Sequence, residues 1–480
     1  MPQRTDALEE DRTLPQGKFA RYMQTLMPLK DELLSDQRLV PVHYDISLKT
    51  FPESHRLDVE VLITAEVPPE PAPYLRLYLG LPGLNKVKLK QVLLGGHAVA
   101  YTYQSPRLTI YPPSPPRAGQ RIVVCVSYSE IPGAPKNYTG VRGSELNAEF
   151  MWLPLVGFPD KAFTARAVTQ VPSGEETAFL GKRLHWEERD GRSLAEWETE
   201  VPITLPAFVS GPFAKSEGVA GGARVNVLVQ RGYERAAAGL AENLARAMEA
   251  GTSWFGELPL SEIYVVQPRR REYGQYAHMP FVVLTRDDVP RDSDPGKAMR
   301  LFEATAHELG HFWWGNVVRS NVLDEGWLSE GFADFAKVLA VELAHGADAR
   351  RDLLSRMLDE LRKARPAHSQ PQPEPPADTG VVAPVPALAE IRAAHPSQPT
   401  VVRRQGGLFL QAFRQYLGED QARRFFRALY SRYRDSIMTT RAFEEMARAT
   451  CPGPEMRQFL KKHLHGQVTY DVDSEGRVVV

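Results

Sequence analysis

Cysteine is nearly absent from this sequence, since its 480 residues include only Cys125 and Cys451. Two cysteines so far apart do not make the disulfide framework of a secreted protein, which indicates a reducing compartment. No hydrophobic run approaches the ~18 residues that a membrane-spanning helix needs. The first residues, MPQRTDALEEDRTLPQGKF, are charged throughout and lack the apolar segment of a signal peptide. These absences predict a cytoplasmic protein with no membrane partner.

An excess of charge of one sign is also missing. Lysine and arginine total 58 and aspartate and glutamate 59, so the net charge is -1. Nucleic acids and acidic membranes attract proteins with strongly positive surfaces, so we expect neither as a partner. The chain is also too long for one ordinary hydrophobic core, which predicts several domains.

The two halves of the chain differ in their hydrophobic spacing. From about 38 to 215, runs such as HYDISLKTF, LDVEVLITAEV and RIVVCVSYS alternate polar and apolar residues, as antiparallel strands with one packed face do. From RAAAGLAENLARAMEAGTSWFG (235–256) onward, apolar residues recur every three or four positions, which is typical of helices. EIYVVQ and FVVLTR interrupt this part and predict a small sheet packed against helices, with FVVLTR as an edge strand.

The residues from 365 to 388 are dense in proline, which cannot continue a helix because it lacks the amide donor. We expect a long loop there, followed by a small helical bundle at 408–465. The fold class is therefore multidomain α+β. The expected parts are an N-terminal extension at 1–37, a β domain at 38–217, an α/β domain with a helical C-terminal part at 218–465, and a tail at 466–480.

The stretch HELGH, 307–311, has the spacing of a metal site. Positions i and i+4 share one face of a helix, so His307 and His311 can bind the same ion. A catalytic zinc ion takes three protein ligands and leaves a position for water. Glu330, in WLSEGFADF, is the best third ligand, on a second helix that should begin near Ser329. We therefore predict one Zn²⁺ per chain.

Two further acidic residues belong to this pattern. Glu308 stands beside the first histidine, where a carboxylate can act as general base. Asp334 follows Glu330 by one helical turn and can accept the free N–H of a ligand histidine, which would fix its tautomer. The alternative for Asp334 is a cap or a solvated position on its helix.

HELGH, eighteen residues and then the glutamate of WLSEGF resemble the zinc aminopeptidase family of aminopeptidase N and leukotriene hydrolase, the gluzincins of peptidase family M1. FWWGN and DEGWLSEGF are similar to the family's QWFGN and DLWLNEGF, and PVHYDISLKT and WETEVPITLPAFVSGPF look like its opening strand and the strand leading into its catalytic domain. The resemblance, from about 38 to 465, implies a β-saddle domain, a thermolysin-like α/β domain and a helical tail. At this length the family's large C-terminal superhelix should be absent. It also implies that His307, His311 and Glu330 bind zinc and that Glu308 is the general base.

The first departure from the family concerns the GxMEN motif, whose glutamate holds the substrate's free ammonium group. Here the stretch reads YGQYAHMPFVVL, and aligning Pro280 with a proline of the family places His278 at the glutamate and Met279 at the asparagine. Histidine supplies no anionic partner near neutral pH. His278 is thus predicted at the substrate's amine end. Glu149 or Glu145, in GSELNAEFMW, is the candidate substitute carboxylate, with a surface or turn role as the alternative.

The second departure concerns the tyrosine that donates to the oxyanion in the family. In TVVRRQGGLFLQAF, alignment on Gly406 places Arg403 at the tyrosine. A guanidinium is a permanent donor suited to a developing negative oxygen, so Arg403 is the predicted catalytic contact. Arg404 and His395 are alternative donors, and salt-bridge or packing roles for the arginines also stay open.

These features support two functions. The first is a zinc-dependent metallopeptidase, aminopeptidase-like, that hydrolyses short peptides with an activated water and a glutamate base. The second is a zinc-binding pseudo-peptidase that binds a peptide or a partner protein without cleavage, because two family elements are replaced. Glu308 favours the first, since it binds no metal and has no use in a site released from catalysis.

Overall fold

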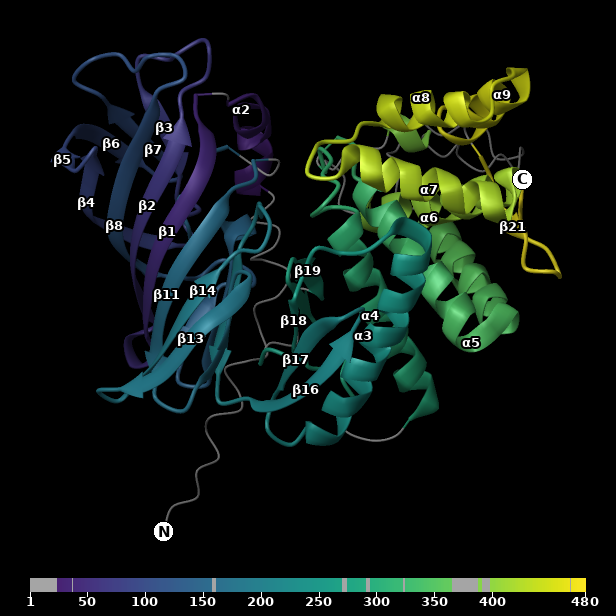
Figure 1. The fold of residues 1–480 in the computed structure, drawn as a ribbon, viewed down its shortest axis with the longest axis horizontal. Helices are drawn as coiled ribbons and strands as arrows, with labels where there is room; N and C mark the ends of the chain where they lie inside the picture. Colours follow the sequence, from purple (N-terminus) through teal and green to yellow (C-terminus); the bar gives the residue numbers. More distant parts are fainter. Residues whose placement is uncertain are drawn as a thin grey trace, which may run out of the picture. The chain divides into compact units, whose positions relative to one another are not determined.

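Figure 1 shows the protein as a computed structural model, in which the described residues are 24–36, 38–157, 161–269, 274–290, 294–322, 324–364, 387–390, 398–466 and 468–480. The chain divides into two compact units, Met1–Phe213 with Pro268–Gly274, and Ala214–Gln267 with Gln275–Val480. The expected boundary after residue 217 falls inside strand β16 (Ala214–Ala220), which belongs to the second unit. His395 and residues 365–386 of the expected proline-rich loop lie outside the described residues.

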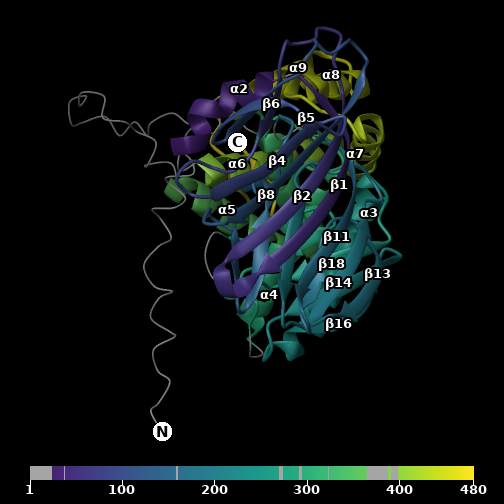
Figure 2. The ribbon, with the colours of Figure 1, turned by 90° about the vertical axis from the view of Figure 1, so that its left-hand side faces the viewer.

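An eight-stranded sheet dominates the first unit, in the order β13-β14-β11-β1-β2-β8-β4-β5 (Figure 2). Its pairs are antiparallel except β1 with β11. Alternate residues of β2, such as Val61 and Ile63, are fully buried, which gives the sheet the one packed face that the sequence predicts. The strands are β1 Val40–Phe51, β2 Arg56–Glu66, β4 Lys86–Leu94, β5 His97–Ala98, β8 Arg121–Ile131, β11 Thr164–Pro172, β13 Lys182–Arg189 and β14 Arg192–Glu198.

Two smaller sheets complete the first unit. One has the order β12-β15-β10-β9 and the other β3-β7-β6. Their strands are β3 Leu75–Tyr78, β6 Ala100–Gln104, β7 Arg107–Tyr111, β9 Tyr138–Gly140, β10 Gly143–Asn147, β12 Glu176–Ala178 and β15 Ala207–Gly211. A one-turn helix, η3 (Ala148–Phe150), follows β10 and carries Glu149.

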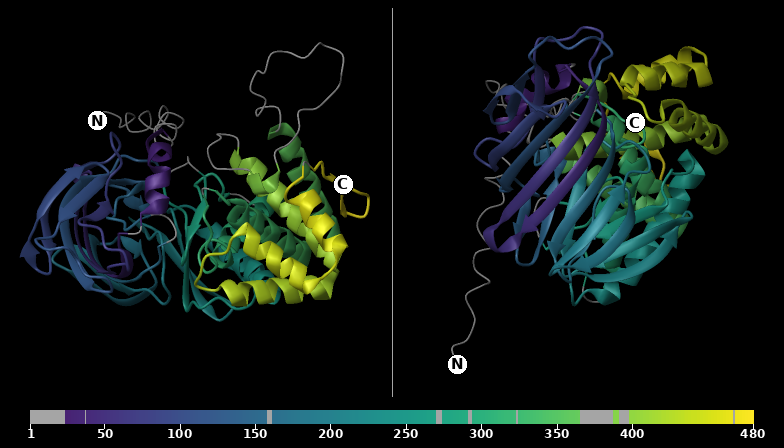
Figure 3. Two further views of the ribbon diagram at one scale, coloured as in Figure 1. Left: turned by 90° about the horizontal axis from the view of Figure 1, so that it is seen from above. Right: turned by 60° about the vertical axis from the view of Figure 1, so that its left-hand side comes forward.

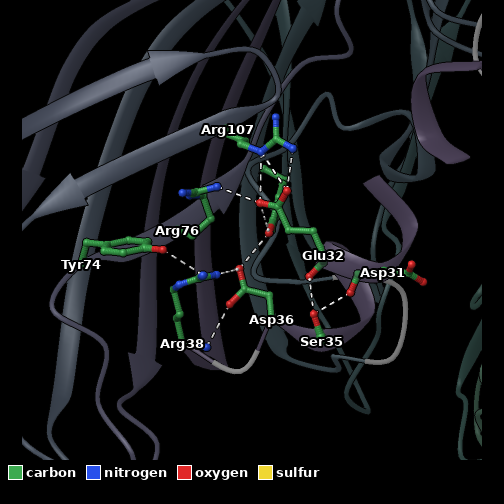
Figure 4. Close-up of polar contacts among 9 residues, drawn as sticks. Asp31, Glu32, Ser35, Asp36, Arg38, Tyr74, Arg76 and Arg107 are labelled. Atoms are coloured by element: carbon green, nitrogen blue, oxygen red, sulfur yellow. Dashed lines mark hydrogen bonds and ion pairs between the residues drawn. The ribbon is translucent and has the colours of Figure 1, made fainter. Parts of the chain in front are cut away.

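The described part of the expected N-terminal extension is folded onto the first unit. Helix α2 (Lys30–Ser35) presents Glu32, whose carboxylate accepts hydrogen bonds from Arg76 at 2.8 Å and from Arg107 at 2.6 Å (Figure 4). These arginines lie on β3 and β7, and Leu33 of the helix is fully buried. Two arginines on one carboxylate, joined to an apolar contact, fasten the helix to the three-stranded sheet.

Glu130 is a buried acid in the core of the first unit. It lies on β8 between Leu57 and Val87 of the neighbouring strands, is 1% exposed, and neither of its carboxylate oxygens has a hydrogen-bond partner. Burial raises the pKa of Glu130 well above its ordinary value, because an apolar surrounding disfavours the charged form. The folded protein therefore binds a proton there that the unfolded chain releases at lower pH.

Glu130→Gln should make stability less dependent on pH. The pKa of Glu130 is higher in the folded protein than in the unfolded chain. The contribution of its bound proton to the free energy of unfolding is therefore complete below about pH 4.5 and is lost as pH rises through the folded pKa. The loss is at most ~1.4 kcal/mol per pH unit. The variant lacks this fall, so its thermal midpoint relative to the parent should rise between pH 5 and pH 9. Melting curves at several pH values test this, with Glu66→Gln, at an exposed position of β2, as the control. A constant difference between variant and parent at all pH values contradicts it.

The second unit contains a five-stranded sheet in the order β16-β17-β18-β20-β19. Strands β17, β18 and β20 are parallel, while β16 and β19 run antiparallel to their neighbours. The expected edge assignment is wrong, because β20, from FVVLTR, is an inner strand. The edge is β19, which ends at His278 and is too short to show periodicity in the sequence. The bounds are β17 Ala223–Val229, β18 Glu262–Val266, β19 Tyr276–His278 and β20 Phe281–Val283.

Most of the rest of the second unit is helical (Figure 3). Aromatic side chains from several of these helices pack against one another. Phe426, for example, lies 4.9 Å from Phe335 and 6.0 Å from Phe332 between ring centroids. The tail ends in a hairpin of β21 and β22. No helix among the described residues is long and apolar enough to cross a membrane. The bounds are α3 Glu234–Phe255, α4 Pro295–Trp313, α5 Trp327–Ala364, α6 Gln398–Leu417, α7 Glu419–Tyr433, α8 Thr440–Thr450, α9 Pro454–His463, β21 Asp471–Val472 and β22 Val478–Val479.

Glycines let the backbones of α4, α5 and α6 touch. A Cβ on Gly310 of α4 would lie 2.9 Å from Cα of Ala333 on α5, and a Cβ on Gly331 of α5 would lie 2.8 Å from Cα of Gly406 on α6. A Cβ on Gly407 would meet Cβ of Asp334 at 2.9 Å. Real Cβ atoms do not come this close to backbone, so each glycine sets the spacing of its pair of helices.

Candidate metal centre

The structure brings together the three side chains that the spacing of HELGH and WLSEGF singles out. His307 and His311 extend from α4, and Glu330 from the first turn of α5. Their possible ligand atoms all lie within 4.8 Å of one another. Glu330 Oε2 is 3.5 Å from His307 Nε2, and Oε1 is 3.7 Å from His311 Nε2. Among the described residues, this is the one group of three such side chains arranged to hold a metal.

These separations fit a zinc ion. Ligand bonds of ~2.0–2.1 Å at tetrahedral angles place two donor atoms ~3.3–3.5 Å apart. The Nε2 to oxygen distances are 3.5 and 3.7 Å, so only small movements are needed for one ion to reach all three. Two imidazoles and a carboxylate form a donor set of catalytic zinc sites. The cluster is compatible with one zinc ion.

The charge states of the ligands suit metal binding. Burial lowers the pKa of His311, which keeps the imidazole neutral and its lone pair available. Burial alone would raise the pKa of Glu330, but His311, His307 and Arg403 outweigh it and bring the value to about 2. Glu330 is therefore an anion, and its side chain stays 39% exposed, on the side open to solvent.

His311 is held by residues that the sequence analysis did not identify. Its Nδ1 lies 3.1 Å from Ser329 Oγ and 3.4 Å from the carbonyl oxygen of Trp314. Because a carbonyl only accepts, Nδ1 is the donor there, and Nε2 faces the ligand cluster. Ser329 directly precedes Glu330 in the sequence. Its position beside the third ligand is the feature from which this contact with His311 could have been predicted.

Asp334 lies beside the other histidine. It is fully buried, and its Oδ1 is 2.9 Å from His307 Nδ1, although the approach is bent away from hydrogen-bond geometry. The same oxygen accepts from Lys337 Nζ at 2.7 Å and Arg403 Nε at 3.0 Å. Its Oδ2 accepts from Arg404 Nη1 at 2.5 Å. A cap or a solvated position does not describe this contact set.

Three cations determine the charge of Asp334. Burial would raise its pKa, but Lys337, Arg404 and Arg403 hold it well below its usual range. Burial lowers the pKa of Lys337 to about 7, because the effect of the neighbouring carboxylate only partly offsets the loss of water. Asp334 is therefore an anion near neutral pH.

Glu308 lies on α4 beside His307 and is 3% exposed. Its carboxylate is close enough to act electrostatically on His311 and on Arg403. Glu308 is not one of the three side chains whose ligand atoms form the cluster.

The edge strand of the second sheet is tied to the end of α4. Asn316 Nδ2 donates to the carbonyl of His311 at 2.8 Å, and Asn316 Oδ1 accepts from the amide of Met279 at 3.1 Å. Met279 follows His278, whose ring lies 5.3 Å from that of Tyr276 on the same strand. The side chain of Asn316 therefore links the end of α4 to the residue that follows His278.

Arg403, Glu149 and Glu145, the other residues predicted to contact a substrate, lie in different parts of the structure. Arg403 makes its described contact with Asp334, while Glu330 and Glu308 act on its guanidinium electrostatically and, with Asp334, raise its pKa although burial opposes this. Glu149 and Glu145 lie in the first unit, on η3 and β10. The contacts of Arg403, His278 and Glu149 with a substrate stay predictions.

Comparison with known proteins agrees with this geometry. Residues 282–462 match the family model described as Peptidase family M1 domain. The M1 zinc metallopeptidase from Deinococcus radiodurans has the same fold, with a TM-score of 0.70 and 20% identity over 91% of this chain and 96% of that one. A mutant of that protein, bound to a Tyr-Ser-Ala substrate, superposes with a TM-score of 0.70 at 19% identity and the same coverage.

Shorter matches connect the chain to larger proteins. Aminopeptidase N of Canis lupus familiaris is 35% identical over 65 residues, and glutamyl aminopeptidase of Sus scrofa is 38% identical over 63 residues. These matches span 14% and 13% of this chain and only 7% of the length of each relative. The solved structures share the two-domain fold of this chain, and the two-histidine, one-glutamate cluster could hold one metal ion. Residues 282–462 of this chain are thus similar to the peptidase family M1 domain.

Proposed function

We propose that this chain is a zinc-dependent metallopeptidase, aminopeptidase-like, that hydrolyses peptide bonds. The observation that carries the proposal is the cluster of His307, His311 and Glu330, in which Nε2 and carboxylate oxygens are 3.5 and 3.7 Å apart, next to a buried Glu308 that the metal does not need. The known M1 structure with a bound Tyr-Ser-Ala peptide supports a peptide substrate.

The residues divide the chemistry between them. When bound, a zinc ion lowers the pKa of a water molecule towards neutrality and polarises the scissile carbonyl group. Glu308 takes the proton of the attacking water and returns it to the leaving amine. Ser329 Oγ is hydrogen-bonded to Nδ1 of His311, and the carboxylate of Asp334 lies 2.9 Å from Nδ1 of His307. Arg403 places a permanent positive charge near Glu330 and Glu308, where negative charge develops in the transition state.

His278 is the residue proposed at the substrate's amine end. His278, held near α4 through Met279 and Asn316, provides no anionic anchor for an ammonium group. Blocked and free N-termini should therefore be distinguished less strictly than by an enzyme with a carboxylate there. Glu149 is the candidate substitute carboxylate.

One experiment tests the function and its main alternative. Purified protein of measured zinc content is incubated with fluorogenic amino-acid amides and with peptides whose N-termini are blocked. Zinc near one per chain and turnover that a chelator abolishes and added zinc restores are the expected results. Turnover of free-amine substrates alone supports a strict aminopeptidase, and turnover of blocked peptides supports an endopeptidase. One zinc per chain with no turnover supports a pseudo-peptidase and overturns the proposal.

The cytoplasmic location belongs to the same proposal. It rests on the two widely separated cysteines. Fractionation of cells that express the full-length protein tests it, and recovery from a membrane or secreted fraction contradicts it.

A further inference from the structure

Asp334 is contacted on both oxygens, and the contacts are unequal. Oδ1 faces His307, Lys337 and Arg403, at 2.9, 2.7 and 3.0 Å. Among the described residues, Oδ2 is contacted by Arg404, at 2.5 Å. A carboxylate held at one oxygen only can rotate and exchange its oxygens, whereas contacts at both oxygens fix its plane.

Arg404 is placed to hold that plane without touching a zinc ligand. It lies on α6 and joins two carboxylates of α5, because Nη1 reaches Asp334 while Nη2 reaches Glu360 at 2.6 Å. Its side chain is 13% exposed, so water competes little for these hydrogen bonds. Glu360, by contrast, is 48% exposed, and its described ion pair is the one with Arg404.

We infer that Lys337, Arg403 and Arg404 form a cation clamp that orients Asp334 against His307 and thereby sets the affinity of the site for zinc. Arg404 is the positioning residue in this clamp that contacts Oδ2, whereas Oδ1 is the oxygen that faces His307. Its action on His307 passes through Asp334. The inference rests on the proposed function only in requiring that His307 binds zinc.

A role in stability alone explains this arrangement poorly. Burying a carboxylate with three cations costs desolvation at every group, and apolar residues of similar size often replace buried ion pairs without loss of stability. Moreover, three of the four contacts meet at the single oxygen that faces the ligand histidine. That concentration is expected if the direction of His307 Nδ1, and hence of Nε2, is what the clamp controls.

The test measures zinc affinity by competition with a chelating dye, so it does not depend on turnover. Arg404→Met keeps the apolar stem but removes the contact with Oδ2, and zinc binding should weaken by about 10- to 100-fold, as for other outer partners of ligand histidines. Arg404→Lys should recover most of this loss, because it keeps a cation near Oδ2. Glu360→Gln is the matched control, since it loses the same helix-to-helix ion pair but leaves Asp334 untouched, and it should bind zinc like the parent.

Each result has a distinct meaning. If the parent protein binds no zinc, the proposed function fails. If the parent binds zinc and Arg404→Met binds it equally well, the clamp is refuted. If Glu360→Gln weakens zinc binding as much as Arg404→Met does, the clamp is also refuted, because the loss then comes from the ion pair between α5 and α6. Should Arg404→Met fail to fold by circular dichroism, Lys337→Met, which removes one contact from Oδ1, is measured in its place, and parent-like zinc affinity refutes the clamp.

Discussion

Glu308→Gln should reduce turnover by about 10²- to 10⁴-fold while zinc content stays at the parent level. General bases contribute acceleration of this size, and the amide that replaces the carboxylate cannot take a proton from water. Zinc should be retained because the three ligand atoms belong to His307, His311 and Glu330. The measurement combines kcat on the best peptide substrate with elemental analysis of the same preparation.

Glu303→Gln is the matched control for this substitution. Glu303 is on the same helix, one turn before His307, and its carboxylate pairs with Arg356. Surface ion pairs of this kind contribute ~0–1 kcal/mol, so activity and zinc should both persist. If Glu308→Gln keeps full activity and full zinc, Glu308 is not the base, and a different proton acceptor must be sought.

Gly331→Ala should damage both the stability and the metal affinity of the second unit. The new Cβ would lie 2.8 Å from Cα and 3.0 Å from the carbonyl carbon of Gly406, and backbone atoms cannot rotate away as side chains do. Overpacking in a tight core costs ~1–3 kcal/mol. Since Gly331 directly follows Glu330, the movement that relieves the clash displaces a ligand, and zinc affinity should fall at least about tenfold.

Gly239→Ala separates this clash from the general effect of adding a methyl group to a helical glycine. Gly239 is inside α3, and a Cβ there would meet nothing within 4 Å. Alanine should raise stability by ~0.4–1 kcal/mol, because it restricts the unfolded chain. Thermal melting and zinc titration of both variants provide the comparison. If the Gly331→Ala protein has the stability and the zinc affinity of the parent, α5 and α6 can move apart without cost.

The ligand set could be predicted from the sequence because its information is local. Four-residue spacing places His307 and His311 on one face, and the motif around Glu330 supplies the third ligand. Asp334 was also predictable, one turn after Glu330. The partners of Asp334 on α6 were not, since Arg403 and Arg404 come some seventy positions later and only packing places them. The contact of Arg403 with Asp334 was left as one of several options for the same reason.

The fold shows a similar division. Alternation in runs such as RLDVEVLITAE predicted β2 and its buried face, because that pattern depends only on neighbouring residues. The parallel pairing of β1 with β11 joins residues more than a hundred positions apart, and no pattern in either strand encodes it. Strand β19 has only three residues, so its place at the sheet edge depends on tertiary contacts.

The glycine contacts between α4, α5 and α6 must be considered when the metal site is designed into another protein. Copying two histidines and a glutamate onto another pair of helices would reproduce the donor atoms but not their separation, because ordinary helices pack 8–10 Å apart axis to axis with side chains between them. Here Gly310 stands between the two histidines along the chain, and Gly331 follows the glutamate. A designer who grafts the ligands should therefore graft these residues without side chains as well.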